Sequence, residues 1–288
     1  MKPPSFLYAC PRSLDEAFVL LAEHGDDAKI LAGGQSLVPM LNLRLAGPKV
    51  LIDVNRIPDL SYVRRDRGTL RIGAMTRHRD LEMSAEARLA EPLIARVAPE
   101  IGHLAIRNRG TIGGSLAHAD PAAEWPLVAV ALDAHLTIRS SRGSRTLGAR
   151  EFFTGPLTTV MGPTEMLTEV AFADAARESR FGFRELSRRP GDFAIVAVAC
   201  RVVRAGSGVC TGATLAVGGA HGRPIHVAEV EGLLRGSRGD DAALRAAADA
   251  VARAVDPGSD VHGSAGYRRR MAGVLARRAL GDAFAEAA

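Results

Sequence analysis

The first 56 residues alternate helical and strand-like hydrophobic patterns. Apolar positions recur at helical spacing over 13–25, and the short apolar runs 29–32 and 50–54 have the length of buried strands. A loop with two adjacent glycines joins the first run to a second helical pattern over 37–45. Because helices alternate with strands here, we expect a small parallel α/β subdomain over residues 1–56.

After residue 56 the pattern changes to hairpins interrupted by helical segments. Apolar and polar residues alternate on both sides of turn residues, which is typical of hairpins. The patterns predict hairpins over 60–73 and 135–147, helices over 79–86 and 91–101, a glycine-rich turn over 109–115 and a strand over 166–172. Antiparallel strands mixed with helices indicate a second subdomain, of α+β type, over residues 57–175.

The last third of the chain begins after a short polar linker at residues 173–180. Apolar runs predict two strands joined by a glycine-containing turn, and later segments with high helix propensity predict helices. These elements are expected at 193–204, 209–218, 240–255 and 267–280. We therefore expect a C-terminal domain over residues 176–288, and an α+β fold for the chain as a whole.

The composition, with 47% hydrophobic and 24% charged residues, is that of a folded globular protein. No apolar stretch approaches the roughly 20 residues that a membrane-spanning helix needs. The N-terminus also lacks the basic and apolar regions of a secretory signal. We therefore expect a cytoplasmic chain without a membrane span.

Charge and cysteine usage exclude two further classes of function. The net charge is +5, but the basic residues are scattered, and three tyrosines and one tryptophan offer few rings for stacking on bases, so we expect no nucleic-acid partner. Cys10, Cys200 and Cys210 form no C-x-x-C pair. This pattern argues against a disulfide framework, a zinc site or an iron–sulfur cluster held by this chain alone.

Two glycine-rich segments are the strongest candidates for a binding site. The first contains Gly33, Gly34, Gln35 and Ser36, and the second contains Thr111, Gly113, Gly114 and Ser115. Adjacent glycines let backbone N–H groups converge on an anion such as a diphosphate, although each pair alone is also explained by a tight turn. The chain has neither a P-loop nor the G-x-G-x-x-G of a Rossmann dehydrogenase. Two separate glycine segments favour a long ligand with a central diphosphate, such as a dinucleotide, held between the two subdomains.

Acidic and histidine side chains follow the second glycine segment. His118 and Asp120 would share one face of an extended chain, but Pro121 then turns the backbone away from Glu124, so a metal site here is the weaker interpretation. Glu124 is better suited to accept a hydrogen bond from a ribose hydroxyl. No G-x-S-x-G elbow is present, which argues against Ser-His-Asp hydrolysis.

Two long motifs carry a resemblance to a known family. Residues 31–44 read LAGGQSLVPMLNLR, and residues 111–124 read TIGGSLAHADPAAE. In this order and spacing they resemble the FAD-binding medium subunit of molybdenum hydroxylases, a family that includes the carbon monoxide dehydrogenase flavoprotein and the flavin domain of xanthine dehydrogenase. Three shorter runs also fit the family, at 72–76, 188–194 and 267–280. The resemblance therefore spans the whole chain.

The resemblance implies a fold and a set of FAD-binding residues. The fold would be a two-subdomain FAD-binding domain of the vanillyl-alcohol-oxidase-like (PCMH) type, followed by a C-terminal domain with a three-stranded antiparallel sheet and helices. Glu124 would accept from a ribitol or ribose hydroxyl, Ile101 and Leu167 would flank ring systems, and Arg184 would lie near the flavin, where many members have lysine. The diphosphate and adenosine part would be lined by Lys29, Ile30, Leu31, Ala32, Gly33, Gly34, Gln35, Ser36, Thr111, Gly113, Gly114 and Ser115.

The resemblance also implies partners. In this family a molybdopterin-containing large subunit hydroxylates the substrate, a small [2Fe-2S] subunit conducts electrons, and the FAD subunit passes them to an external electron acceptor. The chain would then be inactive on organic substrate alone. The alternative is a self-contained flavin oxidase of the same fold, but residues 176–288 are few and poor in aromatic side chains for a substrate domain. A scaffold without flavin would instead predict damaged glycine segments.

Overall fold

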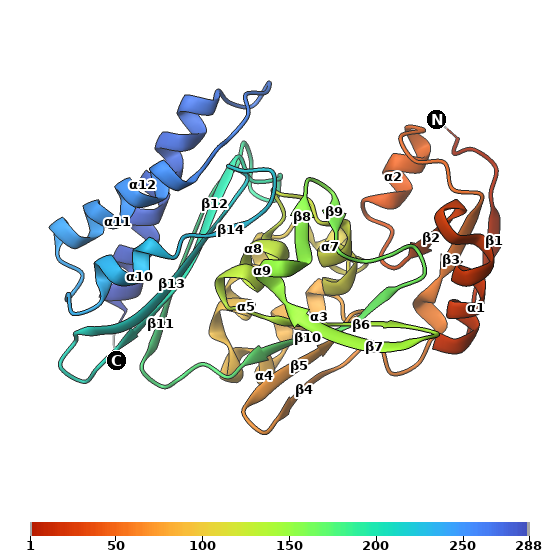
Figure 1. Cartoon of the computed structure of the whole chain (residues 1–288), viewed down its shortest axis with the longest axis horizontal. Helices are drawn as coiled ribbons and strands as arrows, with labels where there is room; N and C mark the ends of the chain where they lie inside the picture. Colours follow the sequence, from red (N-terminus) through yellow and green to blue (C-terminus); the bar gives the residue numbers. More distant parts are fainter. Residues whose placement is uncertain (1, 287–288) are drawn as a thin grey trace.

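A three-stranded parallel sheet organises the N-terminal subdomain, drawn in red and orange in Figure 1. The structure, a computed structural model, describes residues 2–286. The strands in sheet order are β1 (Leu7–Ala9), β3 (Val50–Asp53) and β2 (Ala28–Leu31), the helices are α1 (Leu14–His24) and α2 (Leu37–Asn42), and 3-10 turns lie at Gly25–Asp27 and Val54–Arg56. The predicted strands, helices and parallel pairing are confirmed.

Strand β1 and the start of α1 are two local details that the hydrophobic pattern does not reveal. Strand β1 has no apolar alternation to predict it, because it is a short edge strand and Leu7 is 68% exposed. Ser13 caps α1, since its hydroxyl accepts from the Glu16 amide at 3.1 Å. The Glu16 carboxylate, however, accepts from the amide of Arg12 at 2.8 Å, one residue before the position that a capping box requires.

The central subdomain is built on a five-stranded antiparallel sheet. In sheet order its strands are β4 (Val63–Asp66), β5 (Thr69–Gly73), β10 (Met166–Ala173), β6 (His135–Ser140) and β7 (Gly143–Gly148), and a small hairpin is formed by β8 (Phe153–Gly155) and β9 (Thr158–Thr159). Both predicted hairpins are present. Arg67 and Gly68 turn the first one, and both have positive φ, as a tight hairpin turn requires. Its first strand begins at Val63 rather than at residue 60.

The helices of the central subdomain are shorter than predicted. They are α3 (His78–Met83), α4 (Ala85–Ala90), α5 (Pro92–Val97), a 3-10 turn at Ala98–Glu100, α6 (Leu104–Arg107), α7 (Ile112–His118), α8 (Glu124–Ala131) and α9 (Ala149–Phe152). Ser84 ends α3 and caps α4, and Pro92 begins a new helix because it has no N–H to continue the old one. The second glycine segment, predicted as a turn, is instead the first turn of α7, with Thr111 as its cap.

The C-terminal domain is a sheet enclosed between two layers of helices (Figure 1). Three long antiparallel strands, as the resemblance implies, are joined by a two-residue fourth. They are β11 (Ser179–Leu186), β12 (Val196–Arg204), β13 (Cys210–Gly218) and β14 (Ile225–His226), and the helices are α10 (Glu229–Leu234), α11 (Asp241–Ala254) and α12 (Ala265–Ala285). The helices α10 and α12 cover one face, while α5 and α8 of the central subdomain cover the other. This arrangement places β11 at the seam between the two domains.

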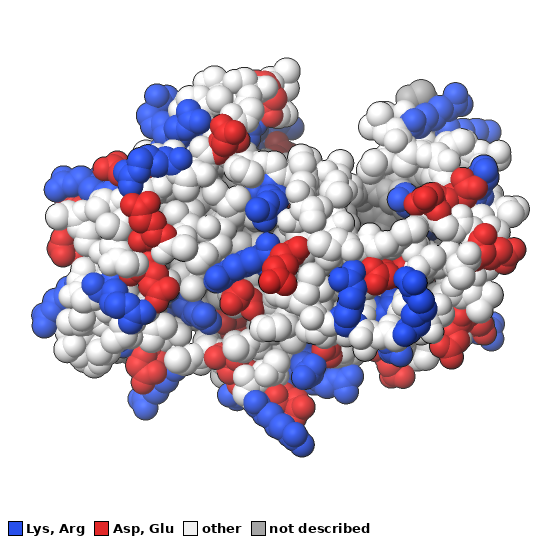
Figure 2. Space-filling model, in the orientation of Figure 1, with Lys and Arg blue, Asp and Glu red and all other residues white. Residues whose placement is uncertain are grey.

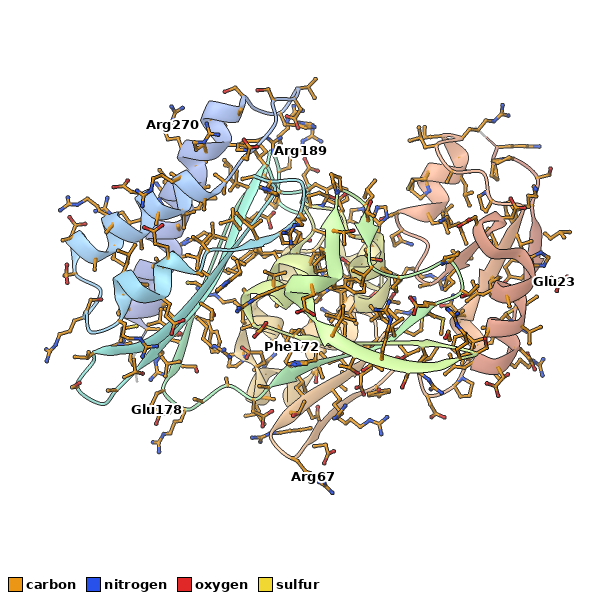
Figure 3. The ribbon with its side chains drawn as sticks, viewed as in Figure 1. Glu23, Arg67, Phe172, Glu178, Arg189 and Arg270 are labelled. Atoms are coloured by element: carbon orange, nitrogen blue, oxygen red, sulfur yellow. The ribbon has the colours of Figure 1, made fainter. Side chains whose placement is uncertain are left out.

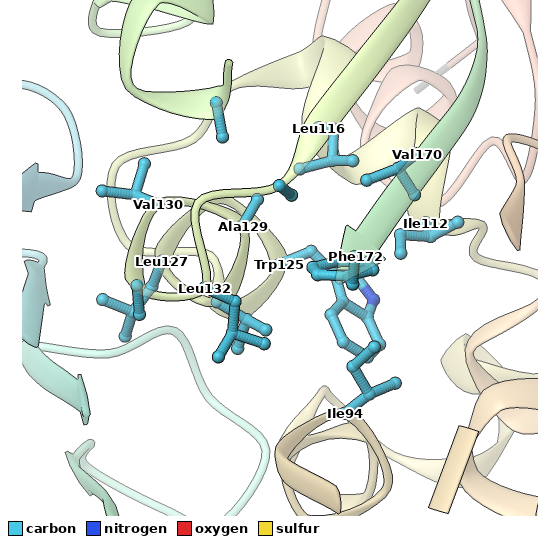
Figure 4. Close-up of a cluster of buried hydrophobic side chains, with 14 of the residues drawn as sticks. Ile94, Ile112, Leu116, Trp125, Leu127, Ala129, Val130, Leu132, Val170 and Phe172 are labelled. Atoms are coloured by element: carbon cyan, nitrogen blue, oxygen red, sulfur yellow. The ribbon is translucent and has the colours of Figure 1, made fainter. Parts of the chain in front are cut away.

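The buried side chains show how the seam is held together. One continuous core joins the central helices and sheet to residues of β11 and β12, including Phe181, Phe183 and Ala199. Trp125 on α8 is 1% exposed and lies among Ile94, Ile112 and Phe172, as Figure 4 shows. Figure 3 shows Glu178 in the linker that crosses from this core to β11. Within residues 2–286, no helix combines the length and apolar character needed to cross a bilayer.

Candidate functional site

A cavity of about 660 Å³ lies between the N-terminal and central subdomains, where Figure 2 shows the surface hollowed between two lobes. Its volume is in the range of sites for organic cofactors. Fourteen of the sixteen residues proposed from the sequence line it: Lys29, Ile30, Ala32, Gly33, Gly34, Gln35, Ser36, Ile101, Thr111, Gly113, Gly114, Ser115, Glu124 and Leu167. Leu31 lines a smaller hollow that shares residues of the first glycine loop with the cavity and also contains Val38 and Arg109. The topology thus brings together segments more than 70 residues apart.

The first glycine loop presents free backbone donors to this cavity. Within the described part of the chain, no acceptor takes the N–H of Gly34, Gln35 or Ser36. Gly34 has φ of +74°, a conformation that glycine adopts without strain. The Gln35 side chain donates to the Gly33 carbonyl at 3.0 Å and so supports the loop from within. Unpaired amides beside a cavity of this size suit an anionic group such as a diphosphate.

The second glycine segment has a different role from the one its sequence predicts. At the start of α7, Ile112 N–H donates to the Thr76 carbonyl at 3.1 Å and Gly113 N–H donates to the Ala74 carbonyl at 2.9 Å. Gly114 N–H donates to the Thr111 hydroxyl at 3.0 Å. These amides are therefore already paired inside the protein, and the expected second cradle of free N–H groups is not formed. The segment lines the cavity without offering it an array of free amides.

Close packing accounts for two of the glycines. A Cβ on Gly33 would lie 2.7 Å from the Cα of Gly110, and one on Gly113 would lie 2.6 Å from the carbonyl oxygen of Ala74. Both distances are too short for carbon, and in both cases the neighbour is backbone that cannot move aside. Gly33 therefore lets the first loop touch the central subdomain, and Gly113 lets α7 lie against the end of β5.

Glu124 is a buried carboxyl that lines the cavity at the start of α8. Burial raises the pKa of Glu124 to about 7, and the negative charge of Asp120 acts in the same direction. Burial and the charges of Glu124 and Glu100 also raise the pKa of Glu185, on β11, to about 8. At neutral pH Glu124 is therefore present in both protonation states and is able to accept or donate a hydrogen bond.

Arg184 lies outside the residues that line the cavity. Its guanidinium forms a two-pronged ion pair with Asp282 of α12, with distances of 2.6 and 2.8 Å, and this pairing raises the pKa of Arg184. The alternation of side chains along β11 explains why Arg184 points toward α12. Gly182, two residues earlier on the same face of the strand, also approaches α12, at Ala279. The expectation that Arg184 lies beside the flavin is therefore not supported by its position, and the next side chain, Glu185, faces the central subdomain instead.

Several lining residues were not assigned from the sequence. Phe193, 62% exposed, reaches the cavity from the loop between β11 and β12, together with Gly191 and Asp192. This loop belongs to the run 188–194 that fits the family, but no residue of it had been given a role. His78 also lines the cavity, although it is only 5% exposed. Hydrophobic periodicity gives no signal for such residues, because loop contacts between domains depend on the tertiary fold.

Between residues 2 and 286, no group of three or more histidine, cysteine, aspartate or glutamate side chains is arranged to hold a metal ion. The weaker interpretation of the sequence was a metal site at His118, Asp120 and Glu124, and these residues do not form such a group. All three line the cavity.

Known proteins resemble the chain along its whole length. The pattern of the FAD-binding domain in molybdopterin dehydrogenase matches residues 4–172, and that of the CO dehydrogenase flavoprotein C-terminal domain matches residues 181–283. The 6-hydroxypseudooxynicotine dehydrogenase complex subunit alpha of Paenarthrobacter nicotinovorans is 43% identical over 99% of this chain and 96% of its own.

Two solved structures share the fold. The carbon monoxide dehydrogenase of Hydrogenophaga pseudoflava contains a chain that superposes with a TM-score of 0.97 at 38% identity, covering 100% of both chains. The quinoline 2-oxidoreductase of Pseudomonas putida 86 contains one with a TM-score of 0.94 at 35% identity, covering 99% of both. Since the first family pattern covers more than half of the chain and these relatives align over nearly all of it, the chain belongs to the FAD-binding subunits of the molybdopterin dehydrogenases.

Proposed function

We propose that the chain is the FAD-carrying electron-transfer subunit of a molybdenum hydroxylase complex. It would take electrons from the [2Fe-2S] clusters of a small partner subunit and pass them to an external acceptor, while a molybdopterin-containing large subunit oxidises the substrate. The free amides of the first glycine loop beside the cavity carry this proposal, because they fit the diphosphate of FAD. When bound, FAD supplies the ability to exchange electrons with both one-electron and two-electron partners.

The residues of the chain would bind and orient the cofactor. Gly34, Gln35 and Ser36 would donate their N–H groups to the diphosphate, and Glu124 would pair with a ribitol or ribose hydroxyl. Ile101 and Leu167, both nearly buried, would flank ring systems. Phe193 would cover an exposed part of the cofactor from the C-terminal domain and keep water from it.

The positions of the three cysteines support the proposal that the [2Fe-2S] clusters belong to another subunit. Cys200 and Cys210 are buried in the C-terminal domain, and Cys10 lies in the N-terminal subdomain. A [2Fe-2S] cluster needs four ligands, and no suitable group occurs among the described residues. The clusters of the relay would therefore belong to another chain.

The similarity leaves the substrate open. Relatives of comparable identity carry names that refer to carbon monoxide, quinoline and 6-hydroxypseudooxynicotine. Substrate choice would lie in the large subunit, which binds the molecule that is oxidised.

The test separates a relay subunit from a self-contained oxidase. The purified chain is expected to bind one FAD noncovalently, seen as flavin absorbance that co-purifies and is released on denaturation. Its FAD should stay oxidised when substrates of the complex are added to the single chain. After co-expression with the molybdenum and iron–sulfur subunits, the same substrates should reduce the flavin. Turnover by the single chain would favour the oxidase, and a chain without affinity for FAD would overturn the proposal.

A further inference from the structure

His78 is a buried histidine that nothing in the proposed flavin site yet uses. It is the first residue of α3 and lines the cavity while being only 5% exposed. Its Nδ1 accepts a hydrogen bond from Nε1 of Trp125 at 2.9 Å; the indole of Trp125 lies in the core shown in Figure 4. This contact joins α3 to α8.

The contact with Trp125 fixes where the imidazole carries its proton. An indole N–H is a donor only, so the Nδ1 that receives it must be unprotonated. The remaining ring proton therefore lies on Nε2. Burial and the positive charges of Arg77 and Arg107 lower the pKa of His78 to about 4, so the ring stays neutral at physiological pH. His78 is a neutral donor of fixed tautomer.

The Nε2–H faces the place where the two subdomains meet. A Cβ on Gly110 would lie 2.5 Å from Nε2 of His78, and Gly33 approaches the backbone of Arg109 and Gly110. Nε2 therefore lies beside the junction of the first glycine loop with the segment that leads into α7. No acceptor among residues 2–286 receives this Nε2–H. His78 Nε2 is not one of the fully buried polar atoms that lack a partner, so this N–H keeps access to the cavity that His78 lines and is free to donate to a ligand there.

We propose that His78 donates from Nε2–H to an oxygen atom of the dinucleotide in the cavity, and that Trp125 positions it for this contact. The inference rests on the proposed function, because it assigns one more contact to the same cofactor. A neutral donor of fixed tautomer would add a directional hydrogen bond without adding charge to the site. Two residues far apart in sequence would act as one unit, with the indole setting the tautomer and the imidazole making the contact.

Two amide substitutions separate the contact from the packing. In His78→Gln the amide nitrogen reaches approximately the position of Nε2, so the donor is kept while the acceptor for Trp125 is lost. In His78→Asn the amide oxygen stands near Nδ1, so Trp125 keeps its acceptor while the donor to the cavity is lost. We expect the Asn variant to bind FAD about tenfold or more weakly than wild type, and the Gln variant, which keeps the donor but loses its positioning by Trp125, to lose less affinity than the Asn variant. Affinity would be measured by calorimetry on the full chain after its flavin is removed.

Competition with ADP shows which part of the cofactor accepts the hydrogen bond. If the acceptor lies in the diphosphate or adenosine half, ADP binding should weaken in His78→Asn as much as FAD binding does. If the acceptor lies in the ribityl or ring half, ADP binding should stay at the wild-type level. Either pattern supports the contact, since FAD binding falls in both.

Imidazole NMR supplies a measurement that needs no substitution. In the full chain labelled with ¹⁵N-histidine, His78 should show a protonated Nε2 and an unprotonated Nδ1, and its Nε2–H signal should shift when FAD binds. Equal FAD affinity of His78→Asn and wild type would overturn the inference, and so would an Nε2–H signal that FAD leaves unchanged. A wild-type chain that binds no FAD would instead overturn the proposed function.

Discussion

At the scale of single residues, close packing between backbones explains why some positions of the glycine motifs must be glycine, without any role in binding a ligand. Gly113 lets α7 approach Ala74 so closely that its own N–H reaches the Ala74 carbonyl. A motif selected for binding and a motif selected for close packing therefore look alike in the sequence. In this chain Gly113 serves packing and Gly34 serves the shape of a loop with free amides.

Gly113→Ala should destabilise the flavin-free chain by about 1–3 kcal/mol, because the added methyl group meets immobile backbone atoms. Urea unfolding of the chain without flavin measures this effect. Gly281→Ala in α12 is the matched control, since a Cβ there meets no atom within 4 Å, and alanine favours helix. A Gly113→Ala chain as stable as wild type would show that β5 and α7 separate easily.

At the scale of elements, a clamp of polar side chains holds the first glycine loop against the central subdomain. Asn55, just after β3, donates to the carbonyl of Ala32 at 2.8 Å. Arg77, just before α3, donates to Oδ1 of Asn55 at 2.6 Å and also to the carbonyl of Arg109. The clamp therefore connects the ends of β2, β3 and α6, which surround the cavity.

Arg77→Ala should lower FAD affinity about tenfold. Without the Arg77 contacts the first glycine loop is more mobile before FAD binds, so it loses more conformational entropy on binding than the loop of wild type. Amide hydrogen exchange over residues 33–37 should become faster in the flavin-free chain. Arg77→Lys is expected to bind FAD little better than Arg77→Ala. An ammonium group lacks the planar guanidinium that donates to both Asn55 and Arg109. Arg79→Ala, which removes an ion pair with Glu82 on the same helix, provides the control. Equal exchange rates in both variants would argue against the clamp.

Local patterns predicted those elements that local chemistry determines. The strands around 29–32 and 50–54 follow from apolar runs, and the hairpin at Arg67 and Gly68 follows from turn residues. The start of α7 could not be recognised from its glycines, because its helical conformation depends on Thr111 as a cap and on the carbonyls of Ala74 and Thr76, just after β5. The direction of Arg184 depends on which layer covers each face of β11, and a single sequence does not contain that information.

At the scale of the whole molecule, acidic side chains gather where the C-terminal domain meets the FAD-binding part. Glu185 on β11 faces Glu124 and Glu100, and its Oε2 is buried without a hydrogen-bond partner. Arg96 crosses the same seam by donating to the Phe181 carbonyl at 2.9 Å. The seam therefore combines a large apolar core with carboxyl groups that favour their neutral form.

This arrangement predicts a pH-dependent stability. The pKa of Glu185 in the folded chain, about 8, lies above the value near 4.5 of an ordinary glutamate. Between these two pH values the folded chain binds more protons than the unfolded chain, so its free energy of unfolding falls as the pH rises. The stabilisation is complete below pH 4.5 and is lost as the pH passes through about 8.

Glu185→Gln should remove the contribution of Glu185 to this dependence, because the amide stays neutral at every pH, whereas Glu124 and Glu91, whose pKa values burial raises to about 7, keep theirs. We expect the variant to match wild type near pH 5 and to exceed it by about 1–3 kcal/mol near pH 9, an amount reduced by the partial solvent access of the side chain. Urea unfolding at both pH values, followed by the near-UV signal of Trp125, measures it. Glu178→Gln, an exposed change in the linker before β11, should leave the pH dependence of wild type intact. If Glu185→Gln loses stability with rising pH as steeply as wild type does, the protonated carboxyl at the seam is not Glu185, and ionisation of Glu124 and Glu91 would have to account for the loss.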